Sequence, residues 1–113
     1  MNSPNGFFQK VVNLESRSFS LRIQKFDNGY FVSVAEGSNK IGSMVVSLAT
    51  GPMPVTTTII PSRTESLFLK LVAERISTMI KGIVLVSSVV QKELDPNTAK
   101  ALMSEIMEMI GND

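Results

Sequence analysis

The spacing of hydrophobic residues in this chain changes near residue 61, and that change limits the folds that the chain can adopt. Before this point apolar and polar residues alternate, which is the period of a half-buried β-strand. After it apolar residues recur every three or four positions, which is typical of amphipathic helices. The sequence of 113 residues therefore predicts strands first and helices late, in a single domain spanning residues 1–113.

Five strands are expected before the period changes. The alternation is clearest around Phe19, Leu21 and Ile23, which share one face of their strand. The dipeptide Asn28-Gly29 follows and is a strong hairpin signal. The expected strands are residues 18–25, 30–35, 41–49 and 55–60, with a less regular opening strand near residues 7–14.

Two helices and one further strand are expected after the change. Ser62 and Glu65 form an S-x-x-E capping box, and Gly82 is a natural helix end. Asp95 and Pro96 supply a second helix start. The apolar stripes are Leu69, Val72, Ile76 and Ile80 in the first helix, and Ala99, Leu102, Met103, Ile106 and Ile110 in the second, with the β-branched strand 83–90 between them. The predicted fold is α+β: a two-layer sandwich with an antiparallel sheet of five or six strands and two helices on one face.

Two helices can cover only one face of such a sheet. We expect the other face to carry few charges and many small, branched or hydroxylated side chains, and a patch of that kind usually marks a partner site. The alternative is that the N-terminal segment folds across it. The covered face is predicted to hold Phe19, Leu21, Ile23, Val32, Met44, Val46 and Leu48. The candidate dimer or partner face is Phe31, Val45, Thr56, Thr58, Ile60, Val84 and Val86.

The composition argues against catalysis and against a metal or cofactor site. The chain has no cysteine and no histidine, which removes disulfides, thiol catalysis and the commonest general base and metal ligand. Thr56, Thr57 and Thr58 have no adjacent base, so they are expected to be strand residues and not nucleophiles. Glu105 and Glu108 lack a further ligand that would complete a metal site. No phosphate-binding glycine motif is present, and Gly42 is expected to mark a bulge or a close backbone approach.

The charge pattern and the apolar runs limit the binding partners and the cellular location that can be expected. The net charge is +1 with no basic block, so no nucleic-acid partner is expected. The apolar runs are too short to cross a membrane, and the first residues lack a signal-peptide pattern. We therefore expect a soluble cytoplasmic protein, with the nucleus as a further compartment. The alternative function is an RNA- or ribosome-associated module, for which the support is Phe7, Phe8, Tyr30 and Phe31 beside Arg22 and Lys25.

Three segments resemble the proteasome assembly chaperone 3 family. They are 39-NKIGSMVVSL-48, 55-VTTTIIPSRTESLFLKLVAERIS-77 and 83-IVLVSSVV-90. The similar features are a Lys-hydrophobic-Gly-Ser strand, a Thr-Thr strand, an acidic residue before a Leu-rich helix (here Glu65 and Leu67), and a Val/Leu-rich strand. The related chaperone 4 shares the architecture but matches less well, and residues 49–54 form a shorter connection than is usual in chaperone 3.

The resemblance implies a specific function. Members of the family are small α+β proteins that dimerise with a related chaperone or with themselves, sheet against sheet. The dimer binds proteasome α subunits, notably the α5 subunit, during assembly of the α ring, and it leaves as β subunits join. Members of the family are not enzymes and use no cofactor.

Overall fold

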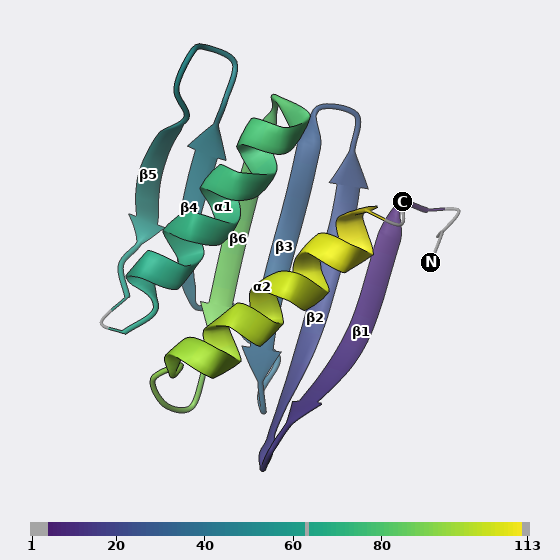
Figure 1. Cartoon of the computed structure of the whole chain (residues 1–113), viewed down its shortest axis with the longest axis vertical. Coiled ribbons are helices and arrows are strands. Elements are labelled where there is room, and N and C mark those ends of the chain that lie inside the picture. The colour runs from purple at the N-terminus through teal and green to yellow at the C-terminus, as the bar shows by residue number, and fades with distance from the viewer. Residues whose placement is uncertain (1–4, 63, 112–113) are drawn as a thin grey trace.

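The computed structural model describes residues 5–62 and 64–111. Strands and helices follow one another in the predicted order, and the predicted α+β fold is confirmed (Figure 1). The elements are β1 (Phe7–Leu14), β2 (Arg17–Phe26), β3 (Gly29–Glu36), β4 (Ser43–Leu48), β5 (Val55–Ile60), α1 (Ser66–Ile80), β6 (Ile83–Val89) and α2 (Pro96–Gly111).

The strands form one six-stranded sheet in the order β1-β2-β3-β6-β4-β5. All neighbouring pairs are antiparallel except β3 and β6, which are parallel. Both helices lie on the same face of the sheet, with α1 over the β4–β6 half and α2 over the β1–β3 half (Figure 1). The central position of β6 explains its nearly continuous run of apolar residues.

The hydrophobic core lies between the helices and this face of the sheet. Both predicted helix stripes point into it, and their central residues have no exposed surface. Burying one such aliphatic side chain contributes about 1.5–3 kcal/mol to folding. The fully buried side chains include Phe19, Leu21 and Ile23 of β2, Val32 of β3, Val84 and Val86 of β6, Leu69, Val72 and Ile76 of α1, and Leu102 and Ile106 of α2.

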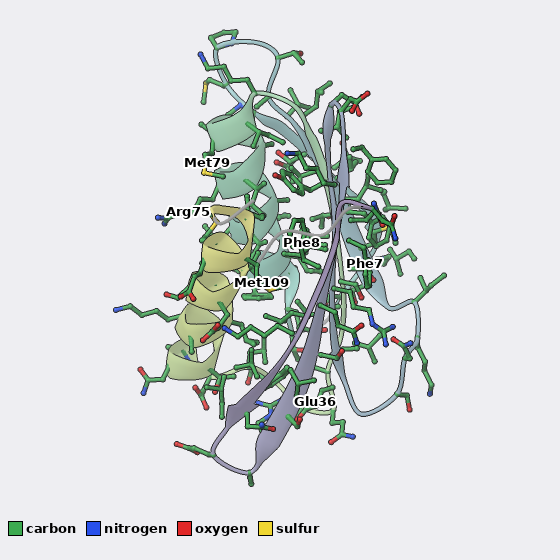
Figure 2. All side chains as sticks on the ribbon, turned by 90° about the vertical axis from the view of Figure 1, so that its right-hand side faces the viewer. Phe7, Phe8, Glu36, Arg75, Met79 and Met109 are labelled. Carbon is green, nitrogen blue, oxygen red and sulfur yellow. The ribbon has the colours of Figure 1, made fainter. Side chains whose placement is uncertain are left out.

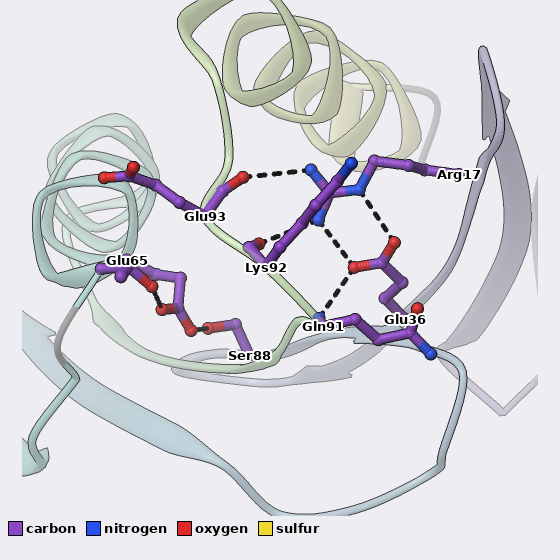
Figure 3. Close-up of polar contacts among 8 residues, drawn as sticks. Arg17, Glu36, Glu65, Ser88, Gln91, Lys92 and Glu93 are labelled. Carbon is purple, nitrogen blue, oxygen red and sulfur yellow. Dashed lines mark hydrogen bonds and ion pairs between the residues drawn. The ribbon is translucent and has the colours of Figure 1, made fainter.

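The start of α1 differs from the prediction. The Ser62 hydroxyl accepts a hydrogen bond from the backbone N–H of Glu65 at 2.8 Å, as in a capping box, but the helix begins only at Ser66. Glu65 is the N-cap residue, and its buried carboxylate accepts a hydrogen bond from the Ser62 hydroxyl at 2.9 Å. It also accepts one from the Ser88 hydroxyl at 3.3 Å (Figure 3). The motif therefore ties the helix start to β6, which sequence spacing cannot show.

Helix α1 ends just before Gly82, as predicted, but the glycine is not its left-handed residue. Lys81, not Gly82, adopts the left-handed conformation, with φ of 54°. Gly82 is needed for another reason, because a Cβ there would lie 2.5 Å from the backbone oxygen of Asn28. The expected close approach at Gly42 is confirmed, since a Cβ there would lie 2.2 Å from the backbone oxygen of Ser88.

The start of α2 agrees with the prediction. The backbone N–H of Thr98 donates to the Asp95 carboxylate at 2.7 Å, and Pro96 is the first helical residue. This backbone hydrogen bond is also the main reason that the pKa of Asp95 lies below its ordinary value.

A buried ion pair holds the loop between β6 and α2 against the sheet. The Arg17 guanidinium donates from Nε and one terminal nitrogen to the Glu36 carboxylate, at 2.8 and 2.7 Å (Figure 3). It also donates to the backbone oxygens of Lys92 and Glu93, while the backbone N–H of Gln91 donates to Glu36 at 2.9 Å. No local sequence pattern indicates this pair, because its two charges lie 19 positions apart on different strands.

Candidate protein interface

The face of the sheet opposite the two helices is called the open face below. Strand pairing assigns its residues, because directly paired residues point to the same side of a sheet. Val46 pairs with Leu85 and with Thr57, and Phe31 also pairs with Leu85, so these side chains share the open face. By the same register its apolar part comprises Phe7, Val11, Phe26, Phe31, Ala35, Met44, Val46, Leu48, Val55, Ile60, Ile83, Leu85 and Val89.

Five of the seven residues predicted for the partner face do not lie on it. Val45, Val84 and Val86 are buried in the core beneath the helices, with at most 1% of their surface exposed. Thr56 pairs with Ser47, and Thr58 pairs with Val45, so both threonines lie on the helix side. The other two predicted residues, Phe31 and Ile60, lie on the open face.

The error has a clear physical origin in β4. Alternation along a strand separates two sets of residues, but it does not tell which set the helices cover. Met44, Val46 and Leu48 were predicted to be covered, yet they lie on the open face. The side chains of β4 that point towards the helices are Val45 and Ser47. The Ser47 hydroxyl lies 2.9 Å from the Ser77 hydroxyl of α1.

An irregularity in the pairing of β4 with β5 changes the face of one further residue. The register shifts between Met44 and Val45, so that Val45 pairs with Thr58 but Met44 pairs with Ile60. Ile59 is the extra residue on the β5 side, as in a β-bulge. Ile60 therefore shares the open face with Met44 instead of following Thr56 and Thr58 to the helix side.

The consecutive threonines belong to the sheet and connect it to α1. The Thr56 hydroxyl lies 2.6 Å from the Glu74 carboxylate and 3.1 Å from the Ser47 hydroxyl. These contacts link β5, β4 and α1 at the edge of the core. Their geometry is that of a structural tether between the sheet and α1.

The apolar part of the open face is large, and the described residues leave much of it exposed. Val55 is 66% exposed, and Leu48 and Ile60 are each more than a third exposed. Six strands about 4.8 Å apart and some 20 Å long present on the order of 600 Å² of flat surface. This is close to the roughly 800 Å² that each partner contributes to a standard interface. A sheet face of this size that exposes many apolar side chains indicates a partner site on a small protein.

The predicted alternative cover for this face is not present in the described part of the chain. Residues 7–14 form β1, which lies at the edge of the sheet and pairs with β2 instead of crossing the face (Figure 1). Residues 1–4 lie outside the described residues.

One groove indents the open face. It has a volume of about 330 Å³ and lies between the first three strands and the connection from β3 to β4. Figure 2 shows Phe7 directed away from the helices and Phe8 directed towards them. The groove is lined by Phe7, Arg22, Gln24, Phe31 and Ser33, and by residues 39–41 of the connection.

The aromatic set proposed for RNA binding is divided between the two faces. Phe7 and Phe31 line the groove together with Arg22. Phe8 and Tyr30 are buried in the core, and Lys25 pairs with Tyr30 and not with a groove residue. The four aromatic residues therefore do not form one stacking surface.

The described residues, 5–62 and 64–111, contain neither a cluster of metal ligands nor a helix able to span a membrane. No group of three or more acidic side chains there could hold a metal ion, and Glu105 is engaged by Lys10 at 2.5 Å. Neither α1 nor α2 is long and apolar enough to span a bilayer.

Comparison with known proteins adds one finding. No protein-family model matches the sequence, and no curated protein is significantly similar to it. The fold has a solved counterpart. A chain from the crystal structure of a chaperone complex for yeast 20S proteasome assembly superposes with a TM-score of 0.66, covering 95% of this chain and 97% of that one. The two sequences are 11% identical, so what they share is the fold.

Proposed function

We propose that this protein is a non-enzymatic chaperone that assists assembly of the 20S proteasome α ring. The observation that carries the proposal is the fold, which matches nearly the full length of a chain from a proteasome assembly chaperone complex. The uncovered apolar sheet face supports it, because a protein that works by binding needs such a surface. The resemblance of residues 39–48, 55–77 and 83–90 to the chaperone 3 family points to the same function.

The proposed mechanism is dimerisation followed by templated binding. The open face packs against the sheet of a related chaperone or of a second copy, which removes side chains such as Val46 and Leu85 from water. Burial of apolar area contributes about 25 cal/mol per Å² before the costs of association. The dimer then binds α subunits, including the α5 subunit, more tightly in the unfinished ring than after β subunits have joined. Differential affinity alone can drive this cycle, and we expect it in the cytoplasm and also in the nucleus.

Affinity capture from the protein's own cells, followed by mass spectrometry, tests this function. The wild-type chain should recover proteasome α subunits and one small partner, with β subunits depleted. Leu85→Asp places a charge in the middle of the open face and should abolish recovery of the small partner. Leu71→Asp is the matched control, because Leu71 is half exposed on α1 and lies on the helix side. Recovery of no α subunits by the wild-type chain would refute the proposal.

The RNA-binding alternative has one specific observation in its favour. Phe7, Phe31 and Arg22 line the same groove, and stacking of bases on aromatic side chains beside an arginine is a common mode of single-strand recognition. RNA binding by contacts to phosphates falls steeply with salt concentration. Salt-sensitive RNA binding that Phe31→Ala abolishes, together with ribosomal proteins in the capture, would favour this alternative over the chaperone function.

A further inference from the structure

The open face carries no acidic side chain at any strand position. The described residues include nine of the ten acidic residues, and each lies elsewhere. Glu36 is on the helix side of β3, where it forms an ion pair with Arg17. The other eight lie on or beside helices, in turns or in loops. They are Glu15, Asp27, Glu65, Glu74, Glu93, Asp95, Glu105 and Glu108.

The open face does carry positive charge, and it is concentrated at the groove. Arg22 lies on β2, paired with Gln9 on one side and Ser33 on the other, and it is only partly exposed. Lys40 lies on the connection across the groove. Within residues 5–62 and 64–111 neither cation has an ion-pair partner. The buried Arg17 differs, because Glu36 matches it with two hydrogen bonds.

Because the open face carries positive but no negative side chains at its strand positions, its charge restricts which protein can cover it. In a two-fold symmetric dimer both subunits contribute the same surface. A second copy of this chain would therefore bring no carboxylate from its open-face strands to Arg22. Burying an arginine without a counter-charge is unfavourable, since the guanidinium cannot lose its proton.

We infer that the open face binds a different chain, whose apolar sheet presents an aspartate or glutamate that enters the groove and pairs with Arg22. Phe7 and Phe31 both pair with Gln24, two residues along β2 from Arg22, and line the same groove, so they would help to exclude water from the pair. Lys40 adds attraction for the same carboxylate from the opposite wall. Arg22 is then the residue that selects this partner over self-association, by attraction in one dimer and by an unpaired charge in the other. This inference rests on the proposed function, because it takes the open face as the dimer interface.

The test compares two associations of one variant, Arg22→Met, which keeps the length of the side chain and removes its charge. The probe is the small chain recovered by the capture experiment, produced as a pure protein, and calorimetry measures its affinity. Sedimentation equilibrium measures self-association of the chain alone. Arg22→Met should weaken binding of the small chain by about 30-fold or more, as expected for one partner of a buried charge pair. It should strengthen self-association by about tenfold, because an unpaired buried charge is removed.

Two controls separate the possible outcomes. Lys70→Met makes the same change of net charge at an exposed position of α1 and should alter neither association. Leu85→Asp should abolish binding of the small chain and self-association. If both associations survive, the open face is not the interface, and the proposed dimer is refuted together with this inference. If Leu85→Asp abolishes both but Arg22→Met changes neither, or shifts both in the same direction, only the role of Arg22 is overturned. Opposite shifts, which a merely structural role of Arg22 would not produce, support the inference.

Discussion

Replacing Glu36 by glutamine should strongly destabilise the fold. The change keeps the shape of the side chain but leaves the Arg17 guanidinium, whose side chain is 8% exposed, without its counter-charge. Arg17 also holds the backbone oxygens of Lys92 and Glu93, so it cannot move out to water without releasing the loop before α2. With its oxygen in the place of Oε1, glutamine can still accept from a terminal nitrogen of Arg17 and from the backbone N–H of Gln91, but its amide nitrogen then faces the Nε–H donor of Arg17.

The expected magnitude follows from the burial of the pair. Removing one partner of a buried ion pair costs about 3–5 kcal/mol. The total free energy of unfolding of a small domain is about 5–15 kcal/mol, so the loss is a large fraction of it. In a chain of this size a loss of 3 kcal/mol lowers Tm by about 12 °C, at roughly 4 °C per kcal/mol.

Urea unfolding followed by far-ultraviolet circular dichroism measures this loss at neutral pH. The double variant Arg17→Met with Glu36→Leu is the control, because replacing both charges with apolar side chains often costs little. We expect its midpoint to lie closer to wild type than that of Glu36→Gln. A loss below about 1 kcal/mol for Glu36→Gln, the level of an exposed pair, would refute the reasoning.

The same pair predicts a pH dependence of stability. The pKa of Glu36 lies below its ordinary value, chiefly because Arg17 hydrogen-bonds its carboxylate. The stabilisation is therefore present above the ordinary glutamate pKa of about 4.3. It is lost as pH falls through the lower pKa of the folded state. The difference in stability between wild type and Glu36→Gln should accordingly shrink on acidification, and a difference independent of pH would contradict this assignment.

Three further changes probe the local structure. Gly29→Ala should destabilise severely in a thermal melt, because its Cβ would lie 1.8 Å from the backbone oxygen of Ile83, whereas Gly51→Ala, with nothing within 4 Å, should be neutral. Thr56→Val should lower the free energy of unfolding, measured in urea, by about 1 kcal/mol, because it removes the hydroxyl that bonds Glu74 of α1. An unchanged free energy would show that this contact does not stabilise the fold. Asp95→Ala should lower Tm modestly through loss of the N-cap of α2, while an unchanged Tm would show that the cap is not formed in solution.

Local patterns were sufficient to predict the elements and one side of the core. Alternation around Phe19, Leu21 and Ile23 correctly marked a covered strand face, and the helix stripes through Leu69 and Leu102 were confirmed. These patterns succeed because the period of side-chain direction is fixed by the backbone of each element.

The candidate interface was predicted less well, because it depends on how separate elements combine. The expectation of an uncovered apolar face was sound, but alternation within β4 could not say which set faces the helices, and Val45 was placed wrongly. The groove joins residues from three strands and a connection, and no sequence spacing brings Phe7, Arg22 and Lys40 together.

The sequence by itself thus determined the order of strands and helices, the amphipathic stripes and the absence of a histidine- or cysteine-based site. The tertiary structure alone decided the strand order, with β6 inserted between β3 and β4, and therefore which residues lie on the open face. The physical reason is that hydrogen-bond register between strands is a long-range property. A shift of one residue moves every side chain of a strand to the other face without changing its local pattern.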